Sequence, residues 1–151
     1  MTLNSPPLMN IFSSRKSYIL NCMILGIRTD KPEAELYVYD NDKVQASLQW
    51  YAHRELSDTL LQKIEEVLSR ASATKQTISG IAIFQGPGSF TGLRIGISVA
   101  NSLAYSLNVP VAATQGDDWL ERAITQLIPA AYSGSAIPHY GSEVHITKQK
   151  K

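Results

Sequence analysis

The sequence has little cysteine and no marked excess of charge of either sign. Cys22 is its one cysteine, which excludes a disulfide within the chain and a zinc site built from cysteines. This usage is typical of a reducing compartment, and we expect a cytoplasmic location. The formal net charge is +1, so the chain lacks the broad positive field that drives non-specific binding to nucleic acids. The sequence also has no apolar run long enough to span a membrane, and no membrane partner is expected.

The two ends of the chain differ in pattern from its middle. With 151 residues, of which 44% are hydrophobic, the chain is long enough for one core and short for two. Residues 1–22 lack the continuous apolar stretch of a signal peptide and are predicted to be a disordered leader or an over-extended start. Arg15 and Lys16 lie among serines with no acid nearby, so an organelle-targeting leader also remains open. The turn-rich residues 129–151 are predicted to form a C-terminal tail.

Between these ends, over 23–128, the hydrophobic pattern changes from alternation to helical spacing and back. Three alternating strands precede an amphipathic helix, a buried strand, a second helix, a short strand and a third helix. Asn41 and Asp42 tolerate positive φ, so the second and third strands should form an antiparallel hairpin, and Asn108 should cap the second helix. The predicted elements are 24–29, 34–39, 44–51, 54–70, 78–84, 90–107, a strand within 109–114, and 117–127. The order β-β-β-α-β-α-β-α predicts a single α/β lobe with a mixed sheet, of the actin-like or ribonuclease-H-like (ASKHA) type.

The loop GPGSFTGLR, residues 86–94, lies between the buried strand and the second helix, where phosphates often bind. It lacks the lysine and hydroxyl residue of a P-loop, since Gly92 is followed by Leu93 and Arg94. It also lacks the third glycine of the dinucleotide fingerprint, because the dipeptide Phe-Thr stands there. The loop therefore matches neither recognised phosphate motif.

Two interpretations of this loop stay open. The free amides and the dipole of a helix start, with Arg94 one turn inside, could hold an anion. The other interpretation is a structural turn in which Ser89 or Thr91 caps the helix.

Four small residues recur every four positions in the second helix: Gly92, Gly96, Ala100 and Ala104. A glycine inside a helix costs about 1 kcal/mol relative to alanine, so some close contact must offset the two glycines. Small residues in register allow another backbone to approach closely. This small-residue ridge predicts tight packing, either on the chain's own sheet or on a partner helix.

Residues 86–113 read GPGSFTGLRIGISVANSLAYSLNVPVAA, which resembles the signature of the TsaB family, bacterial proteins required for threonylcarbamoyladenosine modification of tRNA. MILGIRT, ELYVYD and the helix with LSDTLLQKIEEVL resemble the family's earlier elements more loosely. The resemblance covers residues 23–127 and implies the first lobe of a two-lobed actin-like protein.

Two features depart from the family pattern. Family members carry a second lobe, whereas this chain passes soon after Leu127 to IPHYGSEVHITKQKK, whose Pro-x-Tyr resembles the family's terminal segment. The second lobe is therefore expected to be absent. In the first strand the family usually has an acidic residue followed by threonine, and this chain has Arg28, Thr29 and Asp30. Arg28 would repel the magnesium that a carboxylate organises in related actin-like ATPases.

The resemblance implies a non-catalytic scaffold. TsaB pairs with TsaD, which transfers the threonylcarbamoyl group to tRNA adenosine, and the ATPase TsaE joins that complex. The first-lobe helices make the pairing, so the small-residue ridge would be the partner-contact surface. The implied partners are a TsaD-like protein, TsaE in a larger complex or a second copy of this chain, with tRNA reached only indirectly. No cofactor is implied beyond a nucleotide at a partner interface.

In this interpretation the glycine loop is the rigid entry to the contact helix. Its proline restricts the turn, its glycines permit unusual backbone angles, and a hydroxyl residue caps the helix. The loop residues so implied are Gly86, Pro87, Gly88, Ser89, Phe90, Thr91 and Arg94.

An actin-like ATPase or a metallopeptidase is the competing enzyme hypothesis. His53, His139 and His145 lack the spacing of an HExxH zinc motif, although His139, Glu143 and His145 could converge in the tail. A flexible tail seldom holds a metal, and we expect no metal site.

No catalytic residue is expected elsewhere in the chain. Ser89 lacks the second glycine of a nucleophile elbow. Asp117 and Asp118 are interpreted as acids of a helix's first turn. A free-standing interaction module that has lost the tRNA pathway remains a third hypothesis.

Overall fold

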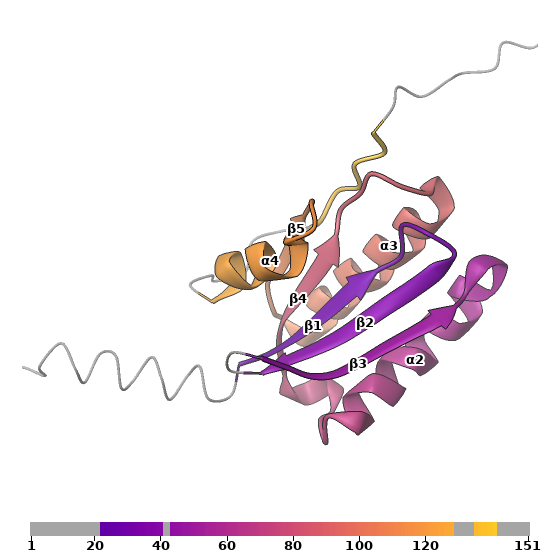
Figure 1. Cartoon of the computed structure of the whole chain (residues 1–151). Coiled ribbons are helices and arrows are strands. Elements are labelled where there is room, and N and C mark those ends of the chain that lie inside the picture. The colour runs from indigo at the N-terminus through magenta and orange to yellow at the C-terminus, as the bar shows by residue number, and fades with distance from the viewer. Residues whose placement is uncertain (1–21, 41–42, 129–134, 142–151) are drawn as a thin grey trace, which may run out of the picture.

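The computed structural model describes residues 22–40, 43–128 and 135–141, which form a five-stranded sheet with helices on both faces (Figure 1). The strands are β1 (Met23–Arg28), β2 (Glu33–Asp40), β3 (Lys43–Tyr51), β4 (Ile78–Phe84) and β5 (Val111–Thr114). The helices are α2 (Leu56–Arg70), α3 (Phe90–Leu107) and α4 (Trp119–Leu127), and η1 (His53–Glu55) and η2 (Lys75–Thr77) are 3-10 turns. The predicted order β-β-β-α-β-α-β-α is confirmed.

The strands lie in the order β3-β2-β1-β4-β5. β1, β2 and β3 are antiparallel neighbours, and Leu36 of β2 lies opposite Leu48 of β3. β4 runs parallel to β1, and β5 runs parallel to β4 through the crossover helix α3 that such a pair requires. The antiparallel pairing predicted for the second and third strands is confirmed, while Asn41 and Asp42, predicted to turn between them, lie outside the described residues.

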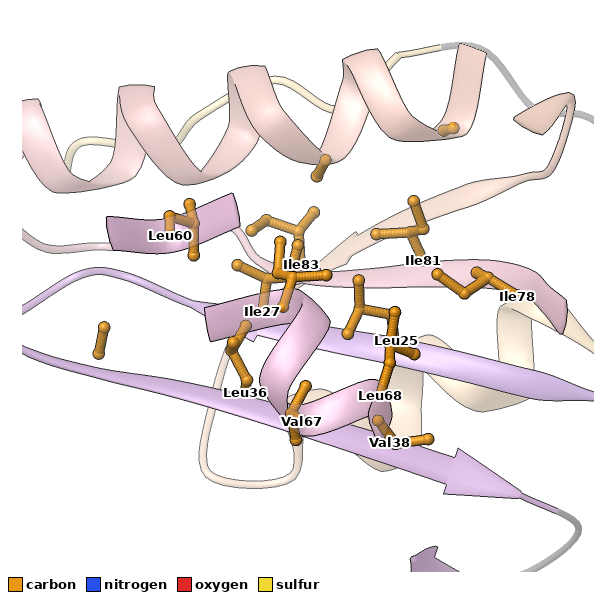
Figure 2. Close-up of a cluster of buried hydrophobic side chains, with 14 of the residues drawn as sticks. Leu25, Ile27, Leu36, Val38, Leu60, Val67, Leu68, Ile78, Ile81 and Ile83 are labelled. Atoms are coloured by element: carbon orange, nitrogen blue, oxygen red, sulfur yellow. The ribbon is translucent and has the colours of Figure 1, made fainter. Parts of the chain in front are cut away.

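The larger core lies between the sheet and the helices α2 and α3, which cover one face (Figure 2). Side chains alternate across a strand, so every second residue of β2 points into this core, while α2 contributes residues three or four apart. Burying each leucine or isoleucine contributes about 1.5–3 kcal/mol before the entropy of ordering is subtracted. The larger buried side chains are Leu25, Ile27, Leu36, Val38, Leu60, Ile64, Val67, Leu68, Ile81 and Ile83.

Helix α4 covers the opposite face, over β4 and β5 (Figure 1). The Trp119 ring packs edge-on against Phe84 and Tyr37, with ring centroids 6.0 and 6.1 Å apart. Gly80 leaves room for Leu127, since a Cβ at Gly80 would lie 3.3 Å from the Leu127 Cδ2 atom. β4 is therefore covered on both faces, which explains its continuous apolar sequence ISGIAIF.

Two helices begin later than their patterns predict. α2 begins at Leu56 because the 3-10 turn η1 takes the residues before it. α4 begins at Trp119, and Asp118 occupies its N-cap position without a side-chain cap bond. The interpretation of Asp117 and Asp118 as acids of the first turn is therefore wrong, because both residues precede the first helical residue. Glu121 is the acid of that turn.

The cap predicted at the end of α3 is confirmed. Asn108 has φ 54° and ψ 48°, in the left-handed region, and its amide donates to the carbonyl oxygens of Ala104 and Tyr105. Asparagine enters this region at low cost because its short polar side chain can bond locally.

The first strand is Met23–Arg28, one residue earlier at each end than the predicted 24–29. Residues 1–21 lie outside the described residues, as do Glu143 and His145 of the predicted tail. Residues 135–141 of that tail are described and lie against the end of β4 and against α3. Across 22–40, 43–128 and 135–141, the structure contains no helix with the length and apolar character needed to cross a bilayer.

Candidate functional site

The candidate site is the glycine loop that joins β4 to α3. The Ser89 Oγ atom accepts a 3.3 Å hydrogen bond from the amide of Gly92, so Ser89 rather than Thr91 caps α3. The Ser89 amide in turn donates a 2.8 Å bond to the carbonyl oxygen of Asp30. Gly86 has φ 125°, which side chains rarely allow, and the Gly86–Pro87 peptide bond is cis. The loop is thus tied to the end of β1 as well as to its own helix.

The close approach of Thr29 and Asp30 requires glycine at three positions of the loop and of the start of α3, Gly88, Gly92 and Gly96. A Cβ at Gly88 would lie 2.5 Å from the Asp30 Cβ atom. A Cβ at Gly92 would overlap the Thr29 carbonyl oxygen, and one at Gly96 would overlap Thr29 Oγ1. The first two turns of α3 therefore rest directly on the residues that follow β1.

This packing corrects the expectation that the small-residue ridge is a partner-contact surface. Gly96 meets Thr29, and Ala100 and Ala104 are 0% and 2% exposed within the larger core. Gly92, the first ridge residue, also faces Thr29. The ridge packs on the chain's own sheet because helix-on-sheet packing gains from small side chains in the same way as helix-on-helix packing does.

Arg28 and Asp30 form an ion pair beside the loop. Arg28 Nε lies 2.8 Å and Nη2 3.3 Å from the two carboxylate oxygens of Asp30, and the guanidinium carbon lies 4.0 Å from the centre of the Phe84 ring. The bond to Asp30 raises the pKa of Arg28 above its ordinary value, against the opposing effect of burial. Glu35 adds a weaker contact at 3.9 Å. The carboxylate that would have to bind a metal next to this loop is already bonded to Arg28.

The other candidate ligands do not gather. The ring centroids of His53 and Tyr51 lie 5.7 Å apart. Asp118 forms an ion pair with Arg122, with 3.0 Å between Oδ2 and Nε. The backbone amide of His139 donates a hydrogen bond to the Gln85 carbonyl oxygen. Within the described parts of the chain, no three His, Cys, Asp or Glu side chains are placed to hold a metal ion.

A hollow of about 300 Å³ opens at the start of α3. Ser89, Thr91 and Gly92 line it from the loop, while Lys31 and Arg54 line it from beyond β1 and from η1. These hydroxyl and basic groups lie at a helix N-terminus, which favours an anion, but much of the remaining lining is apolar, from Pro32, Ala52, Leu56 and Ile95. Arg94, the basic residue expected there, does not line it. Lys31 and Arg54 had no signal in the sequence because only the fold brings them to the loop.

Phe90 meets a segment that sequence reasoning treated as a tail. Its ring stacks on that of Tyr140, with centroids 4.2 Å apart and planes 12° apart. The one signal for this contact was the likeness of the Pro-x-Tyr triplet at Pro138 to a family terminal segment.

Comparisons with known proteins confirm the resemblance to the TsaB family. Over 89 residues, 37% are identical to the tRNA threonylcarbamoyladenosine biosynthesis protein TsaB of Buchnera aphidicola subsp. Schizaphis graminum (strain Sg), covering 59% of this chain and 42% of that protein. YeaZ from Pseudomonas aeruginosa superposes with a TM-score of 0.59 and 28% identity, covering 62% of this chain and 44% of YeaZ. The described fold is thus a single actin-like, ribonuclease-H-like α/β lobe.

The chain is also similar to the related transferase. A family model described as TsaD, tRNA N6-adenosine threonylcarbamoyltransferase, matches residues 50–116. The tRNA N6-adenosine threonylcarbamoyltransferase of Geotalea uraniireducens (strain Rf4) is 43% identical over 61 residues, which are 40% of this chain and 18% of that enzyme. The chain spans about two-fifths of the length of the curated TsaB relatives that it matches.

Proposed function

From the confirmed resemblance of this chain to the TsaB family, we propose that it is a non-catalytic partner subunit in the formation of threonylcarbamoyladenosine in tRNA. The observation that carries the proposal is the 37% identity to a TsaB protein over 59% of the chain. The Arg28–Asp30 ion pair supports it, since Asp30 is occupied by a neighbour on its own chain. In this role the chain pairs with a TsaD-like protein, TsaE joins the larger complex, and tRNA is reached only indirectly.

The outward faces of α2 and α3 supply the pairing surface in this proposal. The two helices contact each other on one face of the sheet, and their inward residues are consumed by the core. Leu61 of α2 is 54% exposed and Tyr105 of α3 is 81% exposed, although both are large side chains. Exposed apolar and aromatic side chains of this kind are enriched at protein interfaces.

A nucleotide belongs to this proposal only at the partner interface. The hollow at the start of α3 offers Lys31 and Arg54 to an anion, but the rest of its lining is largely apolar. A partner would have to complete it.

Recovery of partners from the native cell tests the proposal. The tagged full chain should recover a TsaD-like protein, identified by mass spectrometry, and removal of the chain should lower threonylcarbamoyladenosine in bulk tRNA. Recovery of unrelated proteins only, with unchanged tRNA, would identify a repurposed interaction module instead.

The match of residues 50–116 to the TsaD family favours a second candidate, an enzyme. ATP hydrolysis by the purified chain would support it if the activity disappeared on changing Thr29, Asp30 or Ser89. We favour the partner role because the loop has no lysine and Asp30 is paired with Arg28.

A further inference from the structure

Residues 135–141 lie as an extended segment against the glycine loop and α3. Exposed and half-buried residues alternate along it, and Ala136, Pro138 and Tyr140 form the half-buried set. Ile137, between them, is 71% exposed. A period of two is the pattern of a strand that turns one side toward a protein surface. We call residues 135–141 the docked segment.

Asn101, on α3, makes two hydrogen bonds to the backbone of the docked segment. Its Nδ2 group donates a 3.0 Å hydrogen bond to the Ala136 carbonyl oxygen, and its Oδ1 atom accepts a 2.8 Å bond from the Ala136 amide. One carboxamide thus satisfies a donor and an acceptor of one residue, as a neighbouring strand would.

Gln85, at the end of β4, makes a second two-point contact. Its Nε2 group donates a 2.9 Å bond to the Ile137 carbonyl oxygen, and its backbone oxygen accepts a 2.9 Å bond from the His139 amide. Pro138 lies between these two residues and has no amide to leave unpaired. All four hydrogen bonds therefore recognise the backbone rather than a charged side chain.

Shape adds selectivity to these backbone bonds. The Tyr140 ring stacks on Phe90 at 4.2 Å, and Gly86 lacks the side chain that would overlap the His139 carbonyl oxygen. Gly141 has φ 79°, and a Cβ there would lie 2.6 Å from the Pro87 Cβ atom. The surface thus accepts a small residue, a proline and an aromatic residue at alternate positions, with an exposed residue between each pair and a glycine after the aromatic residue. We call the set Gln85, Gly86, Pro87, Phe90 and Asn101 the acceptor surface.

The geometry points to a peptide-binding site: the acceptor surface binds an extended, uncharged peptide by strand-like pairing, and residues 135–141 are its tethered ligand. This mode combines main-chain hydrogen bonds with contacts to alternate side chains. The contact that holds the tethered ligand is small, since it consists of four hydrogen bonds, one ring stack and half-buried rather than buried side chains. While bound, it closes the outer side of the loop at Gly86, Pro87 and Phe90, so its release exposes the loop.

The experiment uses full-length protein and a labelled synthetic peptide with the sequence of residues 135–141, SAIPHYG. Tyr140→Ala removes the ring that anchors the tethered copy and leaves the acceptor surface intact. The peptide should then bind this variant at least about tenfold more tightly than wild type, in which the tethered copy competes at a high effective concentration. Adding Asn101→Ala to Tyr140→Ala should abolish that binding.

Hydrogen exchange reports the tethered ligand directly. The His139 amide should lose protection in Tyr140→Ala and regain none on adding peptide, because the peptide then occupies the acceptor surface in place of the tethered copy. Ile137→Ala is the matched control, because its side chain points outward, and it should behave as wild type in both assays. Gly141→Val should displace the docked segment through its overlap with Pro87 while it keeps the Tyr140 ring. It should therefore bind the peptide and lose His139 protection as Tyr140→Ala does.

Two results would overturn the proposal. The first is that the His139 amide loses protection in both opened variants and neither variant binds the peptide. The second is that the amide stays protected in both variants, which would show that the segment does not leave the acceptor surface when its ring stack or its close fit at Pro87 is lost. A melting curve for each variant establishes that the lobe itself is folded.

Discussion

Thr29 Oγ1 donates a 2.7 Å hydrogen bond to the carbonyl oxygen of Gly92 and so joins the end of β1 to the first turn of α3. Thr29 is 1% exposed, and the helix reaches it only because the helical positions that face it are glycines. The small residues of α3 therefore serve the folding of one chain.

Gly96→Ala should lower the stability of the protein. Its Cβ would overlap Thr29 Oγ1, and overpacking as severe as this costs about 2–3 kcal/mol, of which the roughly 1 kcal/mol gained by replacing a helical glycine offsets only part. We expect a net loss of about 1–2 kcal/mol in the free energy of unfolding, measured with urea. Ser98→Ala, at an exposed position of α3, is the control and should change it by less than about 0.5 kcal/mol. An unchanged or increased stability of Gly96→Ala would mean that the ridge does not rest on Thr29.

Arg28→Met should destabilise the lobe more than the same change at Arg122. Removing the Arg28 guanidinium leaves the Asp30 carboxylate, whose side chain is 10% exposed, without its charged partner. An unpaired buried acceptor costs about 1–3 kcal/mol. Arg122 and Asp118 are 60% and 57% exposed, so loss of their pair should cost about 0–1 kcal/mol. Equal effects of the two changes would show that the Arg28 pair acts as an ordinary surface pair.

Tyr37 should make the protein less stable in alkali. Burial, and then the charge of Glu35, raise the pKa of Tyr37 above its ordinary value of 10.0. A pKa that is higher in the folded state gives a stability contribution that is complete below pH 10.0 and declines as the pH rises toward the folded-state pKa. Tyr37→Phe should reduce the slope of unfolding free energy against pH above that value. Tyr105→Phe, at an 81% exposed position, is the control and should keep the wild-type slope. A wild-type slope in Tyr37→Phe as well would show that Tyr37 does not cause the loss of stability in alkali.

Tyr105→Glu and Leu61→Glu should weaken pairing with a TsaD-like protein while the lobe stays folded. Both positions are exposed on the helices proposed to make the contact, and a charge there would have to be desolvated on association. A loss of at least about tenfold in affinity is expected, measured by calorimetry. Gln62→Glu, at another exposed position of α2, adds a charge without removing an apolar side chain and so tests the effect of charge alone. Unchanged pairing with intact melting curves would show that another face of the lobe makes the contact.

The sequence by itself determined the order of the elements and several of their ends. Alternation predicted β2 and β3, and helical spacing predicted α2 and α3. The cap at Asn108, and a cap at either Ser89 or Thr91, were predictable because caps act within one turn of the chain. The long signature in residues 86–113 identified the family resemblance for the same reason: it is a continuous stretch of chain.

Only the tertiary structure decided which surface each residue serves. Gly96 and Ala100 carry the same pattern whether a sheet or a partner covers them, and the packing of α3 on Thr29 settled the choice. The bond between Asn101 and Ala136, 35 residues apart, has no local signal. A hydrogen bond needs its two groups within about 3 Å, and for residues so far apart in the chain only the packing of the whole lobe sets that distance.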